Sequence, residues 1–253
     1  MRVFNWCAMV AVVTGVVLPA AAQVEPPGLM TKSFTVDVEP GEVLQFEAAL
    51  RDHLTAGVEH QDPWAWYTWQ VIVGQDFGQY IVRSHGHQWQ EFDARAELDR
   101  LARADFMATV AGHTRSIAST IERFEPAISN WPPDVERPAL VSATRYELTF
   151  GGVDEFVAAV ERLHRAVAEQ DPARHYAWLT TVSGSEGPTM TLAVPRANWA
   201  DFEPGQPPLW DTVREVYGEA EAQSIRDTIG RAVRSTSSFV LRLREDLSYE
   251  PER

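Results

Sequence analysis

The sequence predicts an α+β protein made of two tandem copies of one strand–helix–strand–strand–helix–strand unit. Residues 41–93 match residues 151–203 when the sequence is shifted by 110 positions. The identical pairs include Gly41 with Gly151, Trp89 with Trp199 and Phe92 with Phe202. Within each copy, apolar residues alternate in some segments and recur every three or four positions in others, as strands and helices require. A duplicated unit implies an internal pseudo-twofold axis, whereas it names no substrate.

Residues 1–22 have the pattern of a secretory signal peptide. Arg2 is the charged start, an apolar stretch follows, and alanines precede Gln23. A membrane anchor is the alternative, and it is disfavoured because the apolar run is shorter than the ~20 residues that span a bilayer. We expect an exported protein, periplasmic or secreted, without membrane attachment after signal cleavage. Residues 23–33 are then a flexible leader.

Composition disfavours several classes of function. The chain has 253 residues, a net charge of −14 and one lysine, so a nucleic-acid partner would meet general repulsion. Cys7 is the only cysteine and lies in the predicted signal peptide, which leaves the mature protein no disulfide or cysteine nucleophile. The sequence contains no motif of serine hydrolases, phosphate loops, dinucleotide-binding proteins or zinc proteases. We predict no cofactor.

The first copy is expected to span residues 34–129. Alternating apolar residues predict a strand over residues 34–39, and an amphipathic helix follows over residues 42–60. Asp62-Pro63 stops this helix. The remaining elements expected are strands over residues 64–73 and 79–84, a helix over residues 95–117 and a strand over residues 119–125.

The second copy is expected to span residues 139–249, after a proline-containing linker over residues 130–138. It repeats the order of the first copy, with its last helix over residues 208–234 and its last strand over residues 238–244. Arg115 aligns with Arg234 at a shift of 119, so the second copy carries about nine extra residues before this point.

Each copy therefore has the βαββαβ order of a ferredoxin-like unit, a four-stranded sheet with both helices on one face. We predict that two tandem ferredoxin-like units bring their open sheet faces together and close a pseudo-dimeric α/β barrel. The duplicated unit, with Trp89 and Phe92 after the third strand and Trp199 and Phe202 in the second copy, resembles the dimeric α/β barrel superfamily. That superfamily includes NIPSNAP-like domains, antibiotic-biosynthesis-type monooxygenases and haem-degrading proteins. The resemblance implies a cavity inside or between the halves and no particular reaction.

Alternation along the strands divides their side chains between two faces. The face toward the helices is expected to hold Val36, Val38, Tyr146, Leu148, Phe150, Met190, Leu192 and Val194. The barrel face then holds Asp37, Glu39, Arg83, His85, Arg145, Glu147 and Thr191. Unpaired buried charge is unfavourable, so these groups either form ion pairs across the pseudo-twofold or surround a polar ligand.

Four aromatic residues crowd one predicted strand of the first copy. They are Trp64, Trp66, Tyr67 and Trp69, and the second copy has only Tyr176 and Trp178 in the same stretch. Because side chains alternate, two rings point into the barrel and two lie beneath the helices, and a pair is expected to border the cavity unless it only packs the core. This asymmetry is expected when one copy keeps a site and the other becomes structural.

Three histidines are weaker candidates. His85 and His87 form a His-x-His pair, which would put both rings on one face of the strand at a spacing that suits a metal. Two ligands do not complete a site, however, and loop histidines are the alternative. We therefore predict no metal. The resemblance places His113 where haem-degrading relatives carry an iron ligand, although its local sequence does not match theirs; a surface helical histidine is the alternative.

We expect an exported protein that binds a small, partly apolar molecule in a barrel cavity, with no catalytic residue assigned. The ligand-binding candidates are Asp37, Tyr67, Trp69, Arg83, His85, Arg145 and Glu147. One alternative is a cofactor-independent monooxygenase or a haem-handling enzyme. The other is a structural or interaction protein whose barrel is filled by its own side chains. Both a monomer and a homo-oligomer fit the sequence.

Overall fold

The computed structural model describes residues 29–59, 61–132, 137–203 and 207–251. The predicted signal peptide lies outside this part of the chain. The first strand begins at Met30, inside the stretch expected to be a leader.

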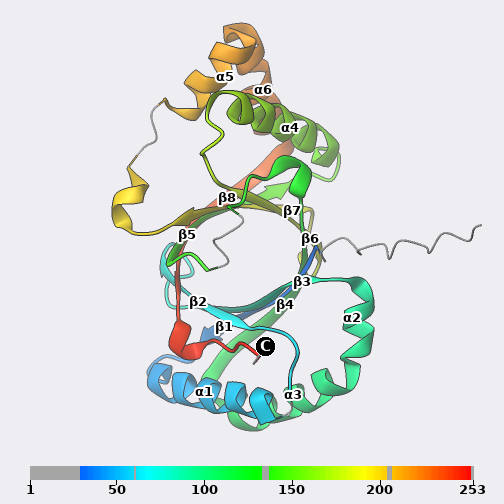
Figure 1. Cartoon of the computed structure of the whole chain (residues 1–253), viewed down its shortest axis with the longest axis vertical. Coiled ribbons are helices and arrows are strands. Elements are labelled where there is room, and N and C mark those ends of the chain that lie inside the picture. Colours follow the sequence, from blue (N-terminus) through cyan, green and yellow to red (C-terminus); the bar gives the residue numbers. More distant parts are fainter. Residues whose placement is uncertain (1–28, 60, 133–136, 204–206, 252–253) are drawn as a thin grey trace, which may run out of the picture.

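Eight antiparallel strands form one closed barrel, in the order β1-β3-β2-β8-β5-β7-β6-β4 (Figure 1). The first half contributes β1 (Met30–Val38), β2 (Tyr67–Val73), β3 (Tyr80–His87) and β4 (Thr114–Phe124). The second half contributes β5 (Leu140–Leu148), β6 (Ala177–Ser183), β7 (Thr189–Arg196) and β8 (Val233–Leu243). The sheets join edge to edge through the pairs β2–β8 and β4–β6, and their open faces become the barrel interior. The predicted fold class is thus confirmed.

The helices cover the outside of the ring at its two opposite sides (Figure 1). In the first half these are α1 (Val43–Glu59), α2 (Trp89–Ala94) and α3 (Ala96–Thr109). In the second half they are α4 (Val153–Gln170), α5 (Leu209–Tyr217) and α6 (Glu219–Ala232). Short 3-10 turns complete the order: η1 (Ala111–His113), η2 (Pro126–Ile128), η3 (Trp199–Phe202) and η4 (Glu245–Leu247). No helix in the described residues is long and apolar enough to cross a membrane.

The repeat found in the sequence coincides with the repeat of strands and helices in the structure. The starts of β1 and β5, and of β2 and β6, are 110 positions apart, whereas those of β4 and β8 are 119 apart. Residues 114–117, expected to be helical, open β4 instead, and Gly218 at φ 79° separates α5 from α6 within the single helix expected there. Most of the residues that begin β4 are small or polar, and they pair with β1. Because β1 is distant in sequence, the local pattern of apolar residues does not predict this strand.

Two glycines mark the seams between the halves. Gly74 has φ 128°, and a Cβ there would lie 2.8 Å from the Cβ of Phe239 on β8. Its counterpart Gly184 has φ 94°, and a Cβ there would lie 2.3 Å from the carbonyl oxygen of Ser119 on β4. Each hairpin therefore crosses the other half's strand at a point where only glycine fits.

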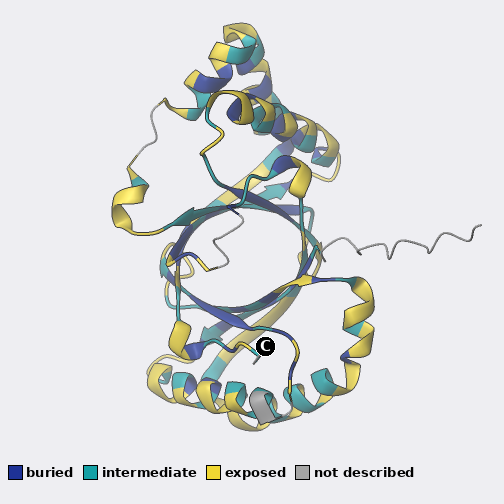
Figure 2. Ribbon diagram, in the orientation of Figure 1, coloured by how far each residue is buried: buried dark blue, intermediate teal, exposed yellow. Residues whose placement is uncertain are grey.

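Most of the barrel ring is buried or half-buried, whereas many exposed residues lie on the helices outside it (Figure 2). The clusters of buried residues follow the predicted division of the strand faces. Val36, Val38 and the buried Phe46 pack in one cluster beneath α1, while Leu148, Met190 and Phe156 pack beneath α4. Phe150 is the exception: β5 ends at Leu148, and the Phe150 side chain is 85% exposed in the turn that follows. The expectation that it faces the helices was wrong because the strand ends before it.

Candidate functional site

Side chains from both halves fill much of the barrel interior. The four aromatic residues divide as expected: Trp64 and Trp66 pack on the helix side, and Tyr67 and Trp69 point inward. The inward pair contacts a buried cluster contributed mainly by the second half, whose members include Val141, Ala177, Leu179, Phe239 and Leu241. Trp69 is therefore part of the barrel core, and it lines neither of the two cavities described below.

One cavity of about 270 Å³ opens at the end of the barrel where the β2–β3 and β6–β7 hairpins lie; we call it the hairpin-end cavity. Two of the predicted candidates, Arg145 and Glu147, line it. Sequence reasoning missed most of its other residues, which include Thr35, Val71, Asp76, Ile81, Ala118, Glu122, Glu186, Arg234 and Phe239. Both halves thus build the wall of this cavity.

The carboxylates Glu122 and Glu147 at this end are paired within their own half and not across the pseudo-twofold, which was one of the two alternatives. Arg83 Nη2 donates to Glu122 Oε2 at 3.1 Å. Glu147 Oε2 accepts hydrogen bonds from the Ser235 hydroxyl and from Arg234, each at 2.8 Å, and these contacts lower the pKa of Glu147.

Asp37 occupies the pseudo-equivalent place of Glu147 in the first half. Its carboxylate forms an ion pair with Arg115 at 3.4 Å, and it does not line the cavity. Asp37, Arg83 and Glu147 therefore have structural partners in this structure.

Arg145 differs from these groups. Its guanidinium carbon lies 5.7 Å from the centre of the Phe239 ring, and its side chain is half-buried. Among the described residues it forms no ion pair within 4.0 Å. It is the arginine of this cavity whose charge is not matched by a contacting carboxylate.

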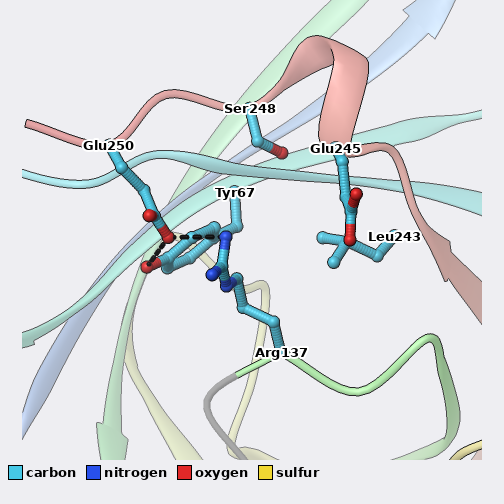
Figure 3. Close-up of a pocket in the computed structure, with 6 residues that line it drawn as sticks. All are labelled: Tyr67, Arg137, Leu243, Glu245, Ser248 and Glu250. Carbon is cyan, nitrogen blue, oxygen red and sulfur yellow. Dashed lines mark hydrogen bonds and ion pairs between the residues drawn. The ribbon is translucent and has the colours of Figure 1, made fainter.

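A second cavity, of about 310 Å³, lies at the opposite end of the barrel; we call it the tail-end cavity (Figure 3). The Tyr67 hydroxyl donates to Glu250 at 3.0 Å, and Arg137 forms an ion pair with the same carboxylate oxygen at 2.7 Å. Figure 3 shows Glu250, on the C-terminal segment, meeting Arg137 from the segment between the halves. Tyr67, Arg137 and Glu250 therefore satisfy one another.

The two histidines of β3 lie on opposite faces of the sheet. The His85 ring is 5.5 Å from the Tyr67 ring at the barrel side, whereas His87 stacks on Trp64 at 3.5 Å beneath the helices. Gly86 between them has φ 86°, which interrupts the strand alternation. The expectation of two rings on one face was therefore wrong. No group of three metal-binding side chains occurs among the described residues.

His87 also contacts a serine, at a spacing that resembles a nucleophile and its base. Its Nε2 lies 2.7 Å from the Ser84 hydroxyl oxygen, and burial, with smaller contributions from His85 and Arg95, lowers the pKa of His87 to about 4. Ser84 is only 1% exposed and lines neither cavity, so a substrate has no path to it. We assign this pair to the core.

The described residues do not fit a haem between the helices and the sheet of the first half, where His113 was a candidate ligand. His113 lies in η1 rather than in a helix facing the sheet, and its Nδ1 contacts Glu42 at 3.1 Å. The space between α1 and the sheet is filled by side chains that include Phe46, Leu50 and Tyr80, each 2% exposed or less. This packing leaves no room for a planar macrocycle there.

Proteins of known structure share this fold. One, described as an anthrone oxidase-like protein, has a TM-score of 0.57 at 13% identity and covers 89% of this chain and 94% of its own. A "putative monooxygenase" from Lactobacillus acidophilus NCFM has a TM-score of 0.51 at 10% identity, with coverage of 88% and 97%. Chlorite dismutase from Candidatus Nitrospira defluvii has a TM-score of 0.52 at 8% identity, with coverage of 87% and 94%.

These similarities establish the class of fold, a dimeric α/β barrel formed here within one chain. No protein-family model matches the sequence, and no curated protein sequence is similar to it. At this level of identity the shared fold does not transfer a reaction.

Proposed function

We propose that the protein binds a small, partly apolar molecule in the hairpin-end cavity. The observation that carries this proposal is the mixed wall of the cavity, in which Phe239, Val71 and Ile81 lie beside Arg145, a half-buried arginine with no ion pair within 4.0 Å among the described residues. Ligand sites usually combine an apolar lining with a few polar groups that fix orientation. The volume of about 270 Å³ is close to the lower limit of about 300 Å³ for such sites, which favours a small ligand.

A screen of small aromatic and aliphatic acids, amides and alcohols tests the proposal, because a ligand of the folded state raises the melting temperature. Ala118 lines the cavity, so Ala118→Phe fills it with a ring. Ile117→Phe, on the other face of the same strand, is the matched control, since its partner Val36 packs beneath α1. We expect hits that Ala118→Phe abolishes and Ile117→Phe keeps. Hits that survive Ala118→Phe, or a screen without hits, would contradict the proposal.

A cofactor-independent monooxygenase is the alternative. It is supported by the proteins of this fold described as a "putative monooxygenase" and as anthrone oxidase-like, and by the contact between Tyr67 and His85 on the barrel side of the sheet. Oxygen uptake measured with the compounds of the same screen separates the two functions, because an oxygenase consumes dioxygen together with the compound, whereas a binding protein does not. Three predictions from the sequence stay predictions. They are export of the protein, a relationship to NIPSNAP-like domains, and the absence of nucleic-acid and membrane partners.

A further inference from the structure

We infer that the ligand of the hairpin-end cavity carries a carboxylate and that Arg145 is the residue that recognises it. This inference rests on the proposed function and specifies its ligand class.

The carboxylates that line the interior of the cavity already have partners, whereas Arg145 contacts none of them. Glu122 is held by Arg83, and Glu147 by Arg234 and Ser235. Arg145 also attracts Glu147 at a distance and helps to lower its pKa, but the direct contacts of Glu147 go to the other two residues. Arg145 is half-buried over the Phe239 ring and contacts no carboxylate within 4.0 Å in the described part of the chain. A guanidinium withdrawn from water needs acceptors for its N–H groups, and a carboxylate meets two of them at once.

The pseudo-twofold strengthens the argument. The position equivalent to Arg145 in the first half is Thr35, which lines the same cavity. The β5 side of the cavity thus holds the half-buried Arg145, whereas the first half lines it with Thr35, Ile81 and Ala118 and with Glu122, whose charge is matched by Arg83. This arrangement suits a molecule with one anionic end and one largely apolar end.

The mouth of the cavity is acidic, which by itself would favour a cation. Asp76 and Glu186 line it from the hairpin loops, and both residues are exposed. Water and salt screen exposed charges much more than half-buried ones. We therefore assign the charge preference inside the cavity to Arg145 and treat preference for a cation as an outcome of the test.

Matched probes measure this preference: benzoate and 2-naphthoate, the corresponding amides, and the corresponding arylmethylamines, titrated by NMR at about 0.15 M salt. We expect the carboxylates to bind at least tenfold more tightly than the amides, about 1.4 kcal/mol. Arg145→Gln should remove this preference. Arg115→Gln is the control, because it deletes the same charge at the same end of the barrel and Arg115 does not line the cavity.

The outcomes distinguish this inference from the proposed function. Equal binding of acids and amides, or tighter binding of the amines, with loss of all binding in Ala118→Phe, would overturn the inference and leave the proposed function standing. A carboxylate preference that survives Arg145→Gln would also overturn it. If no probe shifts the resonances of cavity residues, both this inference and the proposed function are overturned.

Discussion

The two halves of the barrel follow one backbone plan but direct different side chains inward. At shifts of 110 and 119, Tyr67, Trp69, Arg83 and Glu122 of the first half correspond to Ala177, Leu179, Ala193 and Leu241 of the second. The main packing positions between helix and sheet, in contrast, stay apolar in both halves, as Phe46 and Phe156 illustrate. Apolar packing beneath the helices stabilises the same fold in both halves. The residues that face the barrel interior can therefore differ between the halves without loss of the fold.

The helix layers also differ. In the second half, α4, α5 and α6 enclose an apolar cluster of their own that contains Val213 and Ile225, both 1% exposed or less. In the first half, α3 has no buried residue. The first half instead relies on a buried ionic network beneath its helices, and the second half has no counterpart of it among the described residues.

The largest expected difference between the halves concerns that network. Asp62, 6% exposed, accepts hydrogen bonds from Trp66 Nε1 at 2.9 Å and from Arg95 at 2.9 and 3.1 Å. Asp62→Ala should lower the free energy of unfolding by about 3–5 kcal/mol, because it leaves a buried guanidinium without its partner.

The matched control is Asp171→Ala in the second half. Asp171 pairs with Arg174 at 2.8 Å, but the two side chains are 27% and 25% exposed. Its loss should cost less than about 1 kcal/mol. Urea denaturation of both variants measures the difference, and equal losses would show that the two halves do not differ in this respect.

The next largest difference expected between the halves is in how their stability depends on pH. The folded state keeps His87 neutral with a pKa of about 4, whereas the unfolded chain binds a proton near the ordinary value of 6.5. Stability from this residue is therefore complete above pH ~6.5 and is lost as the pH falls toward 4, by at most about 3 kcal/mol. The second half has Ala197 at this position.

The variant His87→Phe, made together with Ser84→Ala to remove the unpaired hydroxyl, should lack this loss. The quantity to compare is the difference in unfolding free energy between pH 7 and pH 4.5 for the variant and for the original protein. An unchanged pH dependence would show that His87 does not carry it.

The smallest expected effect lies at the tail end of the barrel. Glu250 meets Arg137 at 2.7 Å, and both side chains are 43% exposed, whereas the first half has Trp131 at the equivalent position, packed against the inward cluster. A double-mutant cycle with Glu250→Gln and Arg137→Gln should give a coupling of about 0.2–1 kcal/mol that decreases with salt. A coupling above this range that salt does not weaken would mean that the contact closes the barrel end.

Part of the candidate site could be predicted from sequence. Strand alternation placed Arg145 and Glu147 on the inner face, and both line the hairpin-end cavity. The same rule failed at His87, because Gly86 interrupts the alternation. Glu122 was missed for another reason: its place opposite Thr31 depends on how β4 pairs with β1.

The sequence by itself determined the duplication, the order of the elements and the face on which most strand residues lie, because these depend on periods of two to four residues along the chain. Only the tertiary structure decided how the sheet edges join and which charges find partners. Arg83 and Glu122 are 39 positions apart in sequence, and Glu147 and Arg234 are 87 apart. Their contacts, and the absence of one at Arg145 within the described residues, follow from the register of strands that meet only when the barrel closes.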